Sequence, residues 1–352
     1  MAPDEITQNH ANTALPYPPS FIDRFIQFIQ KLPVPYWLTY LLLFILQSVL
    51  NHILVWADKS TPLFTFQRVT LTLPLWMWFP LAIVTFLNKA SEAALDSFQP
   101  LLTIDDVEAN KLKHEFTTMP GRGVVISGVA WLSVYILINY LFFDIYSSIG
   151  WGKSLTLFTV LEGAITFAIG SVMYYHSIRL LWLVNRTVKA AKHFNLFDLN
   201  PVYAFSRLTA RIGVSWVLMA VFTLLVFPVE FKPELVLTFA IIQIGLAFTA
   251  FVLPLRFVNY QLVLEKRRLL TENQLRVEAT LSLLHQHIDL NELGKMEQLN
   301  NAITGLTAER GIIEKVPTWP WRTETLTGFL SATVIPILLL VIQIVIENWL
   351  TR

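Results

Sequence analysis

The chain has 352 residues, of which 54% are hydrophobic and 14% are charged, and its mean hydropathy is +0.54. This balance lies outside that of water-soluble domains and makes a lipid bilayer the expected solvent. A net charge of +1 makes nucleic acid an unexpected partner, and the absence of cysteine excludes disulfides, thiolate catalysis and cysteine-ligated metals.

Residues 1–35 are expected to form a polar tail followed by one amphipathic helix. Ser20 is a candidate N-cap, and Phe21, Phe25, Phe28 and Leu32 recur at helical spacing on one face. The segment is too short to span a bilayer. It is expected either to lie among the inner headgroups or to pack on the cytoplasmic part of the protein.

Seven later segments provide the roughly 20 predominantly apolar residues that a helix needs to cross about 30 Å of hydrocarbon. Together they predict an all-α polytopic membrane protein with seven transmembrane helices. The segments are Tyr36–Trp56, Val69–Leu87, Val124–Ile145, Leu155–Leu181, Ile212–Phe231, Leu235–Val258 and Leu326–Ile346.

The positions of the basic residues orient these spans. With the N-terminus inside, 21 of the 26 Lys and Arg residues fall on inner segments. The positive-inside rule therefore predicts a cytoplasmic N-terminus and an outer C-terminus in a multi-pass protein of the cell membrane. The connections between spans are long only on the inner side, which predicts a helical cytoplasmic subdomain.

A cytoplasmic helical hairpin is expected over residues 259–316, between the six-helix part (36–258) and the C-terminal part (317–352). Apolar residues in its first arm repeat every seven positions: Val263, Leu270, Val277 and Leu284. Leu281 and Ile288 are expected to join this stripe near the end of the arm. The second arm shows alternating spacings of three and four: Met296, Leu299, Ile303, Leu306 and Ile313. Such spacings are typical of a heptad seam.

The partner of this seam is left open by the sequence. It could be the extension of span four, another copy of the chain, or both, and packing within one subunit is an equal alternative. Pro317–Trp321, with two prolines, predicts a stiff extended connector to the seventh span. The connector could transmit hairpin motion to that span or anchor it at the interface.

No sequence motif indicates an enzyme, a cofactor or a metal site. Of the seven histidines, His285 and His287 are closest in sequence, but on a helix they point to different faces. Glu162 is the carboxylate that falls clearly within a span. Because an ionised carboxylate is costly in lipid, we expect it to face the bundle interior, a partner or a water-filled cavity.

The seventh span carries candidate pore or gate residues at three positions. Thr327 and Ser331 lie on one polar face at its cytoplasmic end, and Gln343 lies about 120° around the helix from Ser331. A pore along this helix would be mostly apolar, as in a hydrophobic gate.

The seven-span topology, the long inward extensions of spans four and six, and the helix before span seven resemble the seven-transmembrane ion channel superfamily of insect odorant and gustatory receptors. In that family four subunits assemble through a cytoplasmic anchor domain, and the last span lines a cation pore. The resemblance implies that Met296–Ile313 is an anchor helix and Leu326–Ile346 a pore helix.

Three functional hypotheses follow. The first is a homo-oligomeric ion channel or channel-like receptor that self-associates through its cytoplasmic helices. The second is a non-conducting membrane sensor or scaffold whose hairpin docks a cytoplasmic partner. The third is a small-solute transporter that uses Glu162.

Overall fold

The computed structural model describes residues 15–141, 150–191, 196–226, 233–290 and 293–335, and its regular structure there is helical. A helix over residues 323–335, called the last helix below, follows α10. The other elements are α1 (Phe21–Lys31), α2 (Tyr36–Ala57), η1 (Arg68–Leu71), α3 (Thr72–Phe98), η2 (Gln99–Leu101), α4 (Asp106–Thr117), α5 (Gly121–Leu141), α7 (Lys153–Ala190), α8 (Asn200–Val226), α9 (Pro233–Asp289), η3 (Leu293–Lys295) and α10 (Met296–Lys315).

Six helical stretches within the described ranges are long and apolar enough to cross a membrane. They coincide with the first six predicted spans, and the chain is therefore an integral membrane protein of the helical, multi-pass class. Of the predicted seventh span, residues 326–335 are helical and 336–346 lie outside the described residues. The stretches are Tyr36–Ala57, Arg68–Leu101, Gly121–Leu141, Lys153–Ala190, Asn200–Val226 and Ile241–Asp289.

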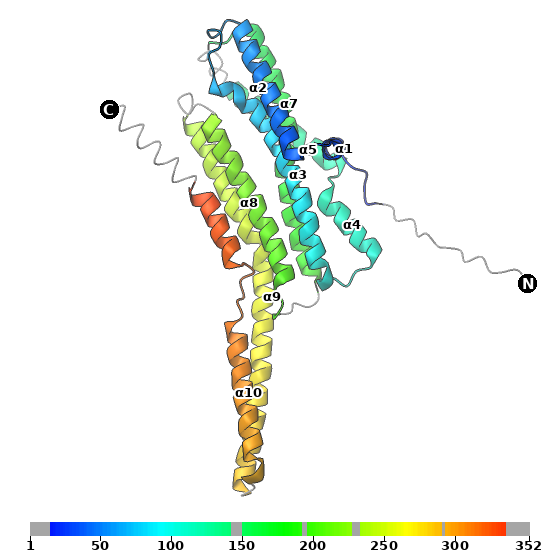
Figure 1. The fold of residues 1–352 in the computed structure, drawn as a ribbon, viewed down its shortest axis with the longest axis vertical. Helices are drawn as coiled ribbons and strands as arrows, with labels where there is room; N and C mark the ends of the chain where they lie inside the picture. Colours follow the sequence, from blue (N-terminus) through cyan, green and yellow to red (C-terminus); the bar gives the residue numbers. More distant parts are fainter. Residues whose placement is uncertain (1–14, 142–149, 192–195, 227–232, 291–292, 336–352) are drawn as a thin grey trace, which may run out of the picture.

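The helices α3, α7 and α8 occupy the middle of the bundle, with α2, α5 and α9 around them (Figure 1). The backbones of α3 and α7 approach closely at Gly170 of α7, where an added Cβ would lie 2.6 Å from the carbonyl oxygen of Trp76 on α3. The Trp76 ring stacks on Phe167 one turn away, with 5.3 Å between centroids. Gly170 thus lets the backbones of α3 and α7 pack closely, as small residues commonly do between membrane helices.

The helix α9 continues for 57 residues, or about 85 Å, and projects well beyond the bundle (Figure 1). α10 runs back beside it, so the predicted seam packs within one chain. Val263, Leu270, Val277 and Leu284 are half-buried along this contact. The expectation that Leu281 and Ile288 join the seam was wrong, because they lie beside it and remain 36% and 46% exposed.

The helix α1 begins with a capping box, as Ser20 predicted: Ser20 Oγ accepts from Asp23 N, and the Asp23 carboxylate accepts from Ser20 N. It buries Ile22, Ile26 and Ile29 against the protein. Of the predicted stripe, Phe21 and Phe28 stay outside, 57% and 60% exposed, whereas Phe25 and Leu32 are half-buried against the core. One face therefore packs on the bundle and the other is free to enter a headgroup layer.

Candidate functional site

Glu162 of α7 lies at the centre of a polar cluster between three spans. Its Oε1 accepts hydrogen bonds from Gln47 Nε2 at 2.5 Å and from Asn51 Nδ2 at 2.9 Å, both on α2. Trp78 Nε1 of α3 donates to Gln47 Oε1 at 2.5 Å. We call these four residues the Glu162 cluster.

Glu162 is half-buried and turned toward α2. This position is the one expected from the free-energy cost of exposing a carboxylate to lipid. Two amide donors converge on one oxygen, which holds the carboxylate while linking α2, α3 and α7. Sequence reasoning found Glu162 but missed Gln47 and Asn51. The available signal was the presence of two amide side chains inside an apolar span, which the same cost argument covers. Among the described residues, no His, Asp and Glu side chains gather into a set that could hold a metal ion.

The hairpin seam is closed by contacts within the chain. Ile313 is 2% exposed, and Met296, Leu299, Ile303 and Leu306 are half-buried against α9. Asn273 of α9, 1% exposed, donates to Leu306 O at 3.0 Å. The predicted seam residues therefore hold the two arms together.

Other apolar side chains of the hairpin remain exposed beside or away from this seam. We call them the outer hairpin surface. They are Leu264, Leu275, Leu281, Leu283, Ile288, Leu290 and Ile312, with exposures of 36% to 60%. Apolar side chains exposed on an arm that projects from a bundle are candidates for contacts with a partner.

The connector after α10 is held to both neighbouring helices. Asn259 Nδ2 of α9 donates to Thr318 O at 3.0 Å, and Ser206 Oγ of α8 donates to Pro320 O. The Trp321 ring stacks on Phe251 of α9, with centroids 5.0 Å apart. The predicted extended connector is thus attached at three points.

The last helix turns a packed face toward α9 and leaves its predicted gate residues outside. Phe329 and Thr333 are 2% and 0% exposed, and the Phe329 ring stacks on Phe251 with centroids 4.2 Å apart. Thr327 and Ser331 are exposed. Gln343 lies outside the described residues. The Glu162 cluster and this face belong to different helices.

A second polar junction fixes the N-terminal segment to α4 and α7. Arg179 of α7 donates to Thr118 O at 2.9 Å and to Tyr17 Oη. Burial raises the pKa of Tyr17 to about 12, against the opposing field of Arg179. Asp23 Oδ2 accepts from Met119 N at 3.0 Å, and burial raises the pKa of this carboxyl despite the hydrogen bonds that it accepts. The junction therefore fastens the N-terminal segment to the bundle.

No family profile, curated protein or solved structure matches this chain.

Proposed function

We propose that several copies of this chain form an ion channel, with the last helix along the conduction path. The observation that carries the proposal is the division of that helix into two faces. Its Phe329 and Thr333 face is buried in the chain, whereas Thr327 and Ser331 face outward. The outward face also exposes Leu330, Val334 and Ile335, so a pore along it would be mostly apolar, as in a hydrophobic gate.

The finer topology belongs to the same proposal. The last helix continues as a seventh span, the N-terminus is cytoplasmic and the hairpin lies in the cytoplasm. These features resemble the seven-transmembrane channels of insect chemoreceptors. The last-span signature of that family is not present in residues 326–346, so support comes from topology and burial instead.

Assembly is assigned to the outer hairpin surface, because the seam is already used within the chain. Leu275 on α9 and Ile312 on α10 are each 59% exposed. Burying such side chains between copies stabilises association at about 25 cal/mol per Å² of apolar area.

The chain contains no cysteine, so single cysteines can report directly on the conduction path. Reconstituted Ser331→Cys should conduct, and a charged water-soluble thiol reagent should change its current. Leu137→Cys, at an exposed apolar position on α5, serves as the control and should not respond. Absence of current in any ionic gradient, or a Ser331→Cys current that the reagent leaves unchanged, would overturn the proposal.

The outer hairpin surface also favours a second function, a sensor or scaffold that docks a cytoplasmic partner. Subunit number separates the two functions. Oligomers in detergent that Leu275→Asp and Ile312→Asp dissociate support the channel. A monomer that conducts nothing supports the scaffold.

A further inference from the structure

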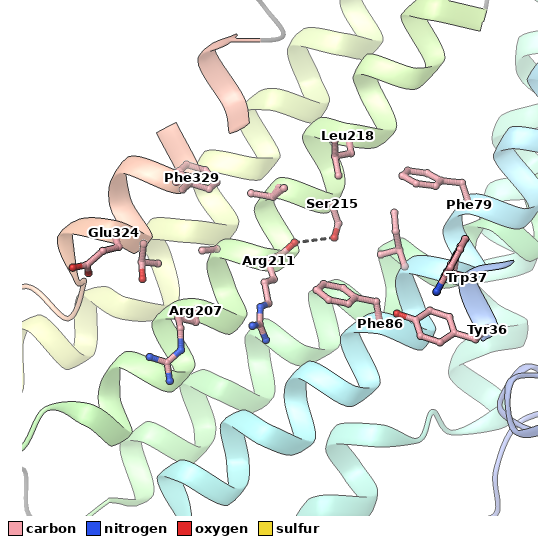
Figure 2. A pocket seen from close by; sticks show the side chains of 16 residues that line it. Tyr36, Trp37, Phe79, Phe86, Arg207, Arg211, Ser215, Leu218, Glu324 and Phe329 are labelled. Carbon is pink, nitrogen blue, oxygen red and sulfur yellow. Dashed lines mark hydrogen bonds between the residues drawn. The ribbon is translucent and has the colours of Figure 1, made fainter. Parts of the chain in front are cut away.

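A groove of about 490 Å³ opens between α2, α3, α8 and the last helix. Figure 2 shows Tyr36 and Trp37 on one side of it and Phe329 on the other, with the α8 side chains Arg207 and Arg211 at one end. This groove is separate from the Glu162 cluster and from the outer hairpin surface.

Its two ends differ in chemistry. Phe79, Ile83 and Leu218 line an apolar length of the groove, and the two arginines stand at the end nearer the start of α8. The Arg211 guanidinium lies over the Phe86 ring, with Cζ 5.7 Å from its centroid. The lining therefore has the polarity of a phospholipid, with cations at one end and an apolar trough beyond.

The cations of the groove lack anionic partners. Within the described part of the chain, neither Arg207 nor Arg211 has a carboxylate within ion-pair distance. Glu324 also lines the groove, but in Figure 2 its carboxylate points away from the two arginines. Arg322 and Arg211 both act electrostatically on Arg207, which concentrates positive charge. Lys89 adds a further cation 4.8 Å from the Tyr36 ring.

The depth of the groove places the arginines at headgroup level. Arg211 directly precedes the apolar stretch that starts at Ile212, and Tyr36 and Trp37 open α2. Aromatic residues and arginines at the ends of spans mark the membrane interface. Phe79 and Leu218 lie further into the apolar parts of α3 and α8 and reach acyl-chain depth.

We propose that this groove binds one anionic phospholipid, with the headgroup phosphate on Arg207 and Arg211 and an acyl chain along Phe79 and Leu218. Basic pockets between spans are known recognition sites for anionic headgroups. The charge complementarity selects this occupant over a second copy of the chain. The lipid would contact α2, α3, α8 and the last helix together and would hold the last helix against the bundle. The proposal does not rest on conduction.

Lipid retention measured by native mass spectrometry on the full-length protein tests the proposal. The probes are phosphatidylglycerol and phosphatidylcholine with identical acyl chains, and soluble glycerol phosphate as the headgroup alone. The wild type should retain phosphatidylglycerol preferentially. Arg207→Gln with Arg211→Gln should weaken retention by about thirtyfold, since each basic residue contributes about fivefold.

Two controls match these changes. Arg24→Gln with Arg122→Gln removes the same charge from exposed positions outside the groove and should leave retention unchanged. Gly328→Phe fills the groove without altering charge, because an added Cβ there meets nothing within 4 Å. It should weaken retention, whereas Gly245→Phe, at an equally open position on α9, should not.

Several results would overturn the proposal. Equal retention of phosphatidylcholine would show that the groove does not recognise an anionic headgroup. Displacement of the lipid by equimolar glycerol phosphate would show that the site binds a soluble anion. Unchanged retention with altered subunit number in the double arginine variant would show that a second copy covers the groove. If that variant fails to fold, Gly328→Phe decides alone, and unaltered retention there would contradict the acyl-chain trough.

Discussion

Asn273 on α9 and Glu309 on α10 are joined across the hairpin by a 3.0 Å hydrogen bond from Nδ2 to Oε2. The same amide nitrogen donates to Leu306 O, also at 3.0 Å. A buried asparagine within an apolar seam fixes the register of two helices, because only one alignment satisfies it. The two arms of the hairpin are therefore held in one register and can move as a single unit.

Asn273→Ala should loosen the hairpin by about 1–3 kcal/mol, the cost of removing a buried hydrogen-bonding partner. Hydrogen exchange of the α10 amides should accelerate accordingly. Gln274→Ala is the matched control, because this neighbouring amide donates to Glu278 on the exposed side of the same helix. Equal exchange rates in the two variants would show that Asn273 does not hold the arms.

Glu162→Ala should destabilise the bundle, because Gln47 Nε2 loses its acceptor and Asn51 Nδ2 is left with the 3.5 Å contact to Thr70 O. Each unpaired buried donor costs about 1–3 kcal/mol. Glu162→Gln keeps an acceptor oxygen and should lower the melting temperature much less. If Gln is as damaging as Ala, the charge itself matters, and transport using Glu162 becomes the hypothesis to test by substrate flux.

The carboxyl group of Asp23 should make the docking of α1 dependent on pH. Burial raises its pKa, so the folded state binds the proton more tightly than the unfolded state. Docking should therefore be strongest below the unfolded pKa and weaken as pH rises through the raised folded pKa. The accepted hydrogen bonds all use Oδ2, which leaves Oδ1 for the proton.

Asp23→Asn should flatten this part of the profile of melting temperature against pH. Asp105→Asn changes an exposed N-cap aspartate of α4 and should retain the wild-type slope. A slope that survives Asp23→Asn would assign the pH dependence to another group.

Gly170→Ala should separate α3 from α7, because the added methyl would meet the Trp76 carbonyl oxygen at 2.6 Å. Overpacking of this kind costs about 1–3 kcal/mol. Gly245→Ala meets nothing within 4 Å and should instead stabilise α9 by up to about 1 kcal/mol through helix propensity. Melting temperatures that move in the same direction would contradict the close approach.

Hydropathy predicted the first six spans because each contains enough consecutive apolar residues to cross the hydrocarbon core of a bilayer. The heptad period likewise identified Val263, Leu270, Val277 and Leu284. Leu281 and Ile288 were misplaced because a two-helix seam is narrow, and residues beside it stay exposed even when apolar.

Contacts between distant segments were beyond the sequence. α1 carries apolar residues on two faces, and its sequence does not indicate which face packs on the bundle. The packed face also carries Asp23, which accepts a hydrogen bond from Met119 N, 96 residues away. Gln47 and Glu162 are 115 residues apart. The groove joins Tyr36 to Phe329 through α8, so no local pattern could have indicated it.

The antiparallel return of α10 also has an evolutionary consequence. Since α10 brings the chain back to the place where α9 leaves the bundle, seven residues added to both arms would lengthen the hairpin without moving the start of the last helix. Seven residues added to one arm would shift the connector by about two turns, or roughly 10 Å. Related chains are therefore expected to vary in hairpin length by paired insertions.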